Sequence, residues 1–181
     1  MTVLTTPTPA DAVALAALKA ATFIEAFGPA NDPNELATHV ARFFNEDTVR
    51  RELQHPASET VWLVEGDRPI AYLKANRSAA HTERGLADGL EVQQIYVRAT
   101  HQGLGHGRTL LTHAIERARH HELAFAWLSV WNENDAAIAF YRHNGFEAFA
   151  ERTFYFGDEA QLDVVMRRVV NVRSDSNDRA V

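Results

Sequence analysis

The 181-residue chain contains no cysteine, and this absence excludes several chemistries. Disulfides, thiolate nucleophiles and zinc sites built on cysteine are impossible, so acyl transfer cannot pass through a cysteine thioester. Positive charge is also scarce, with 18 Lys and Arg against 24 Asp and Glu and a formal net charge of −6. Because non-specific nucleic-acid binding needs a clustered positive surface, this balance argues against a nucleic-acid partner and favours a cationic small molecule.

Long hydrophobic runs are missing as well. Every apolar stretch is shorter than a membrane span, and the first ten residues lack the basic flank and apolar core of a signal peptide. We therefore expect a cytoplasmic protein with no membrane partner. The length and the apolar share of 46% fit one globular domain. We assign that domain to residues 1–170 and expect a polar tail over residues 171–181.

Helix-start signals mark the first third of the chain. Thr8 and Pro9 form an N-cap and first-turn pair, and Asp32 is an acidic cap with a glutamate three residues further on. The expected elements are a strand at residues 3–6 and helices at residues 9–27, 33–44 and 47–54. One face of the first helix carries Val13, Ala17, Ala20 and Ile24.

Beyond residue 54, β-rich runs alternate with helical patterns. A turn signal at residues 66–68 predicts a hairpin, and the polar segment 78–89 predicts a loop. Expected strands lie at residues 61–65, 69–76, 90–97, 124–130, 147–156 and 162–169, with helices at residues 103–120 and 134–144 and a final turn at residues 157–159. This order, with a crossover between neighbouring strands, predicts a mixed α/β fold.

A glycine-rich segment follows the strand that ends at Val97. Gly103, Gly105 and Gly107 lie where a helix is expected to begin, and this arrangement suits a phosphate. Glycines let the backbone approach a ligand, and free N–H groups at a helix start favour negative charge. A Walker A ending is absent, and Arg108 stands where the dinucleotide pattern needs its third glycine. Two interpretations of the glycines remain. They bind another phosphate-containing ligand, or they form a turn that only starts a helix.

Two blocks of the sequence resemble the GCN5-related N-acetyltransferase (GNAT) superfamily. The glycine-rich segment matches its coenzyme A motif, Gln/Arg-x-x-Gly-x-Gly/Ala, at Gln102, Gly105 and Gly107. Segment 134–146 matches its pattern Asn-x-x-Ala-x-x-x-Tyr-x-x-x-Gly-Phe, with Tyr141 at the tyrosine. The resemblance implies the GNAT fold, a mixed and mostly antiparallel α/β sheet of six to seven strands with helices on both faces.

Further similarity points to the PaiA-like polyamine acetyltransferases. It is carried by residues 72–76, 90–97 and 157–159 together with Asp163 and Met166. The chain departs from those relatives at Gln93, where they usually have a second acidic residue. The resemblance implies acetyl-coenzyme A (acetyl-CoA) as co-substrate, no metal, and a small primary amine such as a polyamine as acceptor. It also implies a homodimer, which is common in the superfamily.

The same resemblance assigns the cofactor contacts. Strand amides would bind the thioester carbonyl, the glycine-rich segment the pyrophosphate, and Asn134 the pantetheine. The residues implied are Ile95, Tyr96, Val97, Gln102, Gly103, Leu104, Gly105, His106, Gly107, Arg108, Asn134 and Tyr141. For His106 the alternatives are an auxiliary anion contact and simple exposure. The nine histidines show no recognised ligand spacing, so no metal site is expected.

Catalysis in this superfamily implies direct attack of a neutral amine on the thioester within a ternary complex. Deprotonating an alkyl ammonium at pH 7 costs about 4.6 kcal/mol, so a proton acceptor is needed. Glu91 matches the catalytic glutamate of some members; the alternatives are a solvated strand charge, a substrate-binding carboxylate and transfer through water. Tyr141 would protonate the departing thiolate, and it shares a helix face with Asn134. A core aromatic and a plain N-cap are their respective alternatives.

Three functions share such a cofactor loop: acetylation of a small amine, acetylation of protein lysines or amino termini, and binding of acyl-CoA without catalysis. The presence of Glu91 and Tyr141 argues against the silent binding module. The acidic balance and the long segment 78–89 favour a small cationic acceptor over a basic polypeptide. The leading prediction is therefore an acetyl-CoA-dependent N-acetyltransferase that acts on a small amine.

Overall fold

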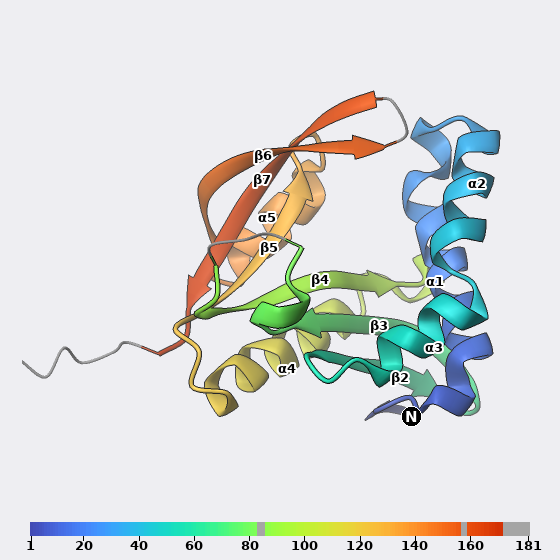
Figure 1. Ribbon diagram of the computed structural model, residues 1–181, viewed down its shortest axis with the longest axis horizontal. Helices are drawn as coiled ribbons and strands as arrows, with labels where there is room; N and C mark the ends of the chain where they lie inside the picture. Colours follow the sequence, from blue (N-terminus) through green and yellow to red (C-terminus); the bar gives the residue numbers. More distant parts are fainter. Residues whose placement is uncertain (83–85, 157–158, 172–181) are drawn as a thin grey trace, which may run out of the picture.

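The computed structural model describes residues 1–82, 86–156 and 159–171. It contains a seven-stranded sheet with the order β1-β2-β3-β4-β5-β7-β6 (Figure 1). The strands are β1 (Thr2–Thr5), β2 (Ser58–Glu65), β3 (Arg68–Asn76), β4 (Gly89–Val97), β5 (Phe125–Trp131), β6 (Glu147–Phe156) and β7 (Glu159–Val169). Neighbouring strands pair antiparallel except β4 and β5, which are parallel. The predicted mixed, mostly antiparallel sheet is confirmed.

Helices cover both faces of this sheet, as predicted. They are α1 (Ala12–Phe27), α2 (Pro33–Phe43), α3 (Glu46–Gln54), α4 (His106–His120) and α5 (Asp135–His143). Helices α4 and α5 share one buried cluster with the strands, whereas α1 and α3 join a second cluster with Trp62 and Tyr72 on the opposite face. Figure 1 shows α3 in front of the sheet and α4 and α5 behind it. Within the described ranges, no helix is long and apolar enough to cross a membrane.

The apolar residues that share one face of α1 in the sequence do not form its buried face. Val13 and Ile24 are 59% and 47% exposed, whereas Leu15, Leu18 and Lys19 are buried. Because the helix contains many alanines, apolar residues occur on every side and their spacing does not single out a face. Packing decides instead, since the leucines of α1 join α3 and the sheet in one cluster.

The start of α4 also differs from prediction. The helix begins at His106 rather than at residue 103, and Gly105 is its N-cap. Gly103 and Gly105 have φ angles of +74° and +85°, which a right-handed helix does not contain. These two glycines therefore form the turn that leads into the helix.

Two predicted loop regions are only partly described. Segment 78–89 contains a 3₁₀ turn at Ser78–Ala80, and β4 begins at Gly89. Most of the predicted turn at residues 157–159 lies outside the described residues, as does the tail beyond Asn171. Asn171 itself donates from Nδ2 to the Leu123 carbonyl at 2.8 Å, so the described chain ends on an ordered contact.

Strands β4 and β5 diverge along their length. Their parallel pairing joins only residues 89–91 to residues 125–127, although both strands continue beyond that point. Packing at the paired end is close, since a Cβ at Gly89 would lie 2.3 Å from the Phe125 ring. Figure 1 shows β5 turning away from β4. Residues 92–97 therefore present a strand edge that is not paired with β5.

Candidate functional site

The glycine-rich loop ends at the N-terminus of α4. In the described parts of the chain, the backbone N–H groups of residues 103–108 have no hydrogen-bond acceptor, as is usual for a first helical turn. A Cβ at Gly103 or Gly105 would meet nothing within 4 Å, so open space lies in front of the loop. Gln102 closes the loop by donating from Nε2 to the Val97 carbonyl at 3.1 Å. This arrangement can receive a phosphate group.

Contacts from distant elements hold the base of this loop in place. Glu25 of α1 accepts from Arg98 Nε and from the backbone N–H of Ala99, each at 2.8 Å. On the other side, His101 Nε2 lies 3.5 Å from the carboxylate of Glu65 in β2. Sequence reasoning missed Glu25, because it lies 73 residues before Arg98 and belongs to no local motif.

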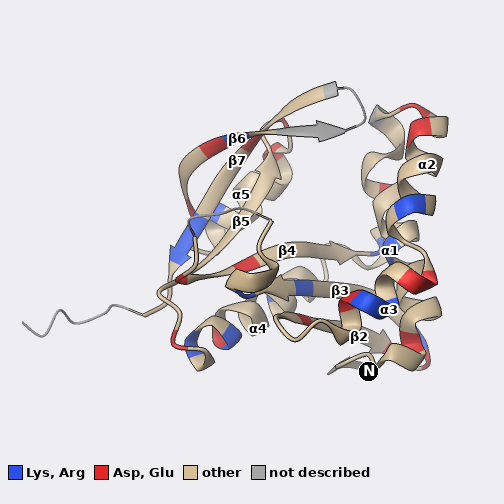
Figure 2. Ribbon diagram, viewed as in Figure 1, with Lys and Arg blue, Asp and Glu red and all other residues tan. Residues whose placement is uncertain are grey.

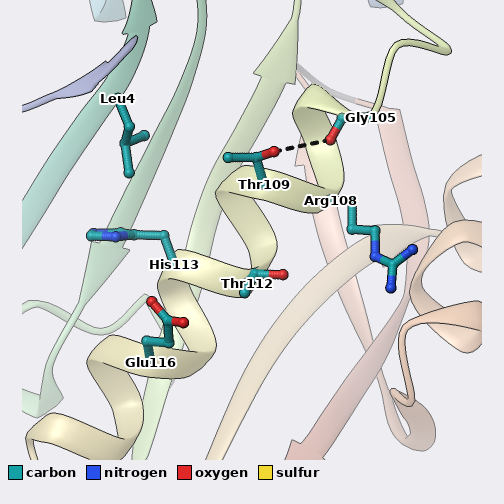
Figure 3. A pocket seen from close by; sticks show the side chains of 7 residues that line it. All are labelled: Leu4, Gly105, Arg108, Thr109, Thr112, His113 and Glu116. Atoms are coloured by element: carbon teal, nitrogen blue, oxygen red, sulfur yellow. Dashed lines mark hydrogen bonds between the residues drawn. The ribbon is translucent and has the colours of Figure 1, made fainter. Parts of the chain in front are cut away.

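Side chains at the start of α4 point in different directions. Figure 3 shows Thr109, His113 and Glu116 along one side of the helix, where they line a hollow together with Leu4 of β1. Arg108 lies on the helix side away from Leu4 in this view. Arg108, Thr112 and Gly105 line the same hollow, so it extends from His113 and Glu116 to the turn at the start of α4.

His106 is the first residue of α4 and is partly buried. Its ring lies 6.4 Å from the ring of His101, so two imidazoles flank the loop. Among the described residues, no group of three or more His, Asp or Glu side chains could hold a metal ion. An auxiliary anion contact by His106 stays a prediction.

A bulge divides β4 into two parts. Lys74 of β3 pairs with Gln94 and Ala75 pairs with Val92, so Gln93 has no pairing partner between them. The bulge lies just beyond the residues that pair with β5. It therefore marks the point where the paired end of β4 gives way to the unpaired edge.

Beyond the bulge, alternate side chains point to opposite faces of the sheet. Ile95 and Val97 pack against the cluster under α4. Tyr96 faces the α1 side, with its ring 6.4 Å from Phe27 and 5.8 Å from Tyr72. The backbone of this segment keeps donors and acceptors on its β5 side, so an extended ligand can bind along the edge.

Tyr141 lies on α5 within the buried cluster. Its ring is 5.3 Å from Phe140 and 6.0 Å from Phe146. Burial raises the pKa of its hydroxyl above the ordinary value, and the nearby phenol of Tyr96 adds to the rise. The hydroxyl therefore stays protonated at neutral pH and can donate a proton. Tyr141 is thus a core aromatic, one of the two predicted interpretations, in a position that also suits the other.

Asn134 is the N-cap of α5. Its Oδ1 accepts from the backbone N–H of Ala137 at 3.1 Å, so the plain capping interpretation is confirmed. This bond uses the carbonyl oxygen of the side chain and leaves the amide group for other partners. A contact between Asn134 and pantetheine stays a prediction.

Glu91 lies at the paired end of β4 and is 2% exposed. Its Oε2 accepts from Asn76 Nδ2 at 2.8 Å and from the Thr82 backbone N–H at 3.1 Å. The Thr82 hydroxyl donates to Oε1. The interpretation as a solvated strand charge is therefore wrong, because a segment folded over the sheet covers the carboxylate. Gln93 accepts from the same Asn76 amide at 3.0 Å.

A second buried carboxylate, Asp163 of β7, lies on the same face and is 7% exposed. Its Oδ2 accepts from Ser129 Oγ at 2.7 Å and from Arg152 Nε at 3.4 Å. Burial raises the pKa of Tyr96 to about 12, and the charge of Asp163 contributes to this rise. Sequence reasoning gave Asp163 no role, because its hydrogen-bond partners come from two other strands, β5 and β6.

These features define a protein that can hold an extended phosphate-containing ligand between a helix N-terminus and a free strand edge. Residues 21–146 match the Acetyltransferase (GNAT) family, which is more than half of the chain. The chain therefore belongs to the Acetyltransferase (GNAT) family, and it is an N-acetyltransferase of the acetyl-CoA-dependent class.

Similar proteins agree with this assignment. An uncharacterized N-acetyltransferase in the pepI 3′ region of Lactobacillus delbrueckii subsp. lactis is 32% identical over 154 residues, which cover 85% of this chain and 89% of that protein. The PaiA N-acetyltransferase of Thermoplasma acidophilum, solved in complex with coenzyme A, has a TM-score of 0.77 at 13% identity and covers 93% of this chain and 99% of its own. YncA of Salmonella typhimurium, solved with its cofactor acetyl-CoA, has a TM-score of 0.67 at 20% identity and covers 96% of each chain. The two solved structures support the fold.

Proposed function

We propose that this protein is a cytoplasmic enzyme that transfers the acetyl group of acetyl-CoA to a small primary amine by direct attack in a ternary complex. The observation that carries the proposal is the unpaired edge of β4 beside the phosphate-accepting turn of α4. A long donor can lie along the edge while the opposite face of the sheet admits an acceptor. Because the chain contains no cysteine, the acetyl group cannot form a thioester intermediate with the protein.

The described residues fit acetyl-CoA. Free N–H groups at residues 103–108 suit the pyrophosphate, and the open space at Gly105 admits it. The backbone amides of residues 95–97 would bind the thioester carbonyl, and Asn134 would bind the pantetheine through its side-chain amide. Acetyl-CoA supplies an activated carbonyl carbon, and these groups of the protein would orient it and stabilise the charge that develops on its oxygen.

For the leaving group we propose Tyr141 as the proton donor. Its raised pKa keeps the hydroxyl protonated until a strong base such as a thiolate forms nearby. The packing against Phe140 and Phe146 would hold the ring in one orientation. Glu91 is the proton acceptor that the family resemblance implies, but Thr82 and Asn76 occupy its oxygens. A proton would reach Glu91 only through the Thr82 hydroxyl or after Thr82 had moved.

The proposed acceptor class is a small cationic amine, with polyamines tested first. Figure 2 shows Lys and Arg interspersed with Asp and Glu along α3 and α4, so the net charge of −6 is not gathered on these helices. Selection of a cation therefore depends on individual carboxylates near the site. Gln93 supplies no charge there, so Gln93→Glu should favour polyamines over monoamines if charge at this position selects the acceptor.

A thiol-release assay with acetyl-CoA would test the proposal. Spermidine, spermine, a simple monoamine and a lysine-containing peptide would be compared under steady-state conditions. We expect turnover with at least one small amine and little with the peptide. Turnover with the peptide alone would replace this proposal by a protein-modifying enzyme, and no thiol release above background with any amine would indicate a silent acyl-CoA-binding module. We also propose a homodimer, which sedimentation velocity would check.

A further inference from the structure

The register of the sheet places two buried carboxylates at different ends of the β4–β5 divergence. Glu91 pairs across with Trp127, where the two strands are joined. Asp163 pairs with Trp131 at the far end of β5, where β5 no longer contacts β4 as a strand partner. The two positions on β5 are separated by roughly 13 Å along the strand. Asp163 therefore lies level with the unpaired part of β4, and Glu91 does not.

The two carboxylates also differ in how many of their oxygens are occupied. Both oxygens of Glu91 accept hydrogen bonds from Thr82. At Asp163, Ser129 and Arg152 both donate to Oδ2, and Oδ1 accepts no hydrogen bond within the described ranges. Oδ1 is not among the fully buried side-chain atoms that lack a partner, so it keeps some accessible surface and is available to a cationic donor from a ligand.

Charged and titratable groups around Asp163 connect it to the leaving-group side. Tyr96 lies close enough for the charge of Asp163 to act on its hydroxyl, and Tyr96 acts in turn on Tyr141. Arg152 of β6 lies beside Asp163 and also donates to the Thr82 hydroxyl at 3.5 Å. Tyr96 thus lies within electrostatic reach of both Asp163 and Tyr141.

We propose that Asp163 is the carboxylate that binds the ammonium group of the acceptor through Oδ1 and takes its proton, while Glu91 holds the segment containing Thr82 against the sheet. This inference rests on the proposed acetyl transfer. Ser129 and Arg152 act as positioning residues, because both donate to Oδ2 and leave Oδ1 for the ammonium group.

The reaction then balances in protons and electron pairs. One N–H bond of the ammonium breaks, and its proton moves to Asp163 Oδ1. The freed lone pair of nitrogen forms the C–N bond to the acetyl carbon, and the C–S bond breaks with its electron pair going to sulfur. Tyr141 gives its proton to that thiolate, and the proton held by Asp163 returns through solvent to the tyrosine. Once the C–N bond has formed, the nitrogen carries a positive charge, and it loses a second N–H proton to solvent. The products are a neutral amide, coenzyme A thiol, the starting enzyme and that one proton in solvent.

The test compares Asp163→Asn with Glu91→Gln, which remove the same charge at the two positions. Thiol release would give kcat and KM for the best small amine from pH 6 to 10, and calorimetry would give the acetyl-CoA affinity. We expect Asp163→Asn to lower kcat/KM for the amine by about 100-fold or more and to leave acetyl-CoA affinity unchanged. Glu91→Gln should lower kcat/KM at least tenfold less than Asp163→Asn does.

Ser129→Ala provides a milder variant in case Asp163→Asn does not fold. It leaves the carboxylate in place and removes one hydrogen bond to Oδ2, so we expect a drop of about three- to tenfold in kcat/KM with an intact pH profile. If the wild type turns over the amine, Asp163→Asn keeps this activity and Glu91→Gln loses it, the assignment of Asp163 is overturned. The proposed function would still stand in that case. A wild-type protein that releases no thiol with any amine would instead contradict the proposed function itself.

Discussion

The two halves of β4 have the same strand geometry but different surroundings. Residues 89–91 pair with β5, and the Phe125 ring leaves no room for a side chain at Gly89. Glu91 in this half is covered and fully hydrogen-bonded. Residues 92–97 begin at a bulge and have no strand partner on the β5 side. Residues 89–91 thus continue the sheet into β5, whereas residues 92–97 leave backbone groups free for a ligand.

This difference teaches that position along a strand does not by itself identify a catalytic carboxylate. Glu91 matches the family pattern in sequence, yet its neighbours in space use it to fix a covering segment. Asp163 contributes to the PaiA-like resemblance without an assigned role, yet it lies level with the unpaired half of β4, and its two hydrogen-bond donors both bind Oδ2. The divergence of β4 and β5 separates the two environments.

The largest effect is expected from a substitution in the phosphate-accepting turn, beside the unpaired residues 92–97 of β4. Gly105→Glu should lower acetyl-CoA affinity by about 100-fold or more, because the new carboxylate would occupy the space before the free N–H groups and repel the pyrophosphate. Isothermal titration calorimetry on the folded variant would measure this loss. An unchanged affinity would show that the cofactor binds elsewhere.

A matched control is available at Gly66 in the turn between β2 and β3. Gly66 also has a positive φ of +61° and nothing within 4 Å of its would-be Cβ. Gly66→Glu therefore adds the same charge and the same backbone strain away from the free N–H groups. We expect its acetyl-CoA affinity to stay close to that of the wild type, while its thermal stability falls by an amount similar to that of Gly105→Glu.

The next effect concerns chemistry at the open half. Tyr141→Phe removes one hydroxyl and keeps the aromatic packing against Phe140 and Phe146. We expect turnover to fall by roughly ten- to a thousandfold with acetyl-CoA affinity unchanged, the range for loss of a general acid. Single-turnover kinetics would show whether the chemical step is the one that slows. If that step kept its wild-type rate, Tyr141 would be a packing residue only.

The smallest effect is expected in a third region, which has no part in the chemistry. Lys19 is 1% exposed beneath the sheet, where it and Lys74 share the carboxylate of Glu52. Burial lowers the pKa of Lys19 from 10.5 to about 8, and the attraction to Glu52 opposes that fall. At a pH where Lys19 is charged in both states, this lowered pKa reduces the free energy of unfolding by about 3 kcal/mol relative to a lysine with the ordinary pKa.

The sign of the pH dependence follows from where the proton binds. Between pH 8 and 10.5 the unfolded chain holds the Lys19 proton and the folded chain does not, so stability should rise with pH across this window. Lys19→Met should remove this contribution and leave acetyl transfer unchanged. Urea unfolding of both proteins at several pH values would measure it, and parallel pH profiles for the two proteins would contradict the assignment.

Local patterns in the sequence were enough to predict the glycine turn before α4 and the helix that carries Tyr141. The phosphate-accepting turn depends on residues 102–107, which are adjacent in the chain, and Asn134 and Tyr141 share one short helix. The mixed α/β class also followed from alternating strand and helix patterns, and the mostly antiparallel sheet from the family resemblance. Such features are set by nearby residues, so the sequence displays them directly.

Features set by distant residues could not be predicted in this way. The bulge opposite Lys74, the divergence of β5 and the burial of Glu91 all depend on pairing and covering by other elements. Asp163 receives its partners from β5 and β6, and no spacing in the sequence connects them. The buried face of α1 could not be predicted for a similar reason, because its alanines fit either side until packing selects one.

The account depends most on the claim that the unpaired half of β4 is the edge along which acetyl-CoA binds. Amide hydrogen exchange, measured with and without saturating acetyl-CoA, tests this claim residue by residue. We expect slower exchange in the cofactor complex for amides within residues 95–97 and 103–108, and no change for residues 89–91, which are already paired. Unchanged exchange at residues 95–97 in a saturated complex would contradict the account.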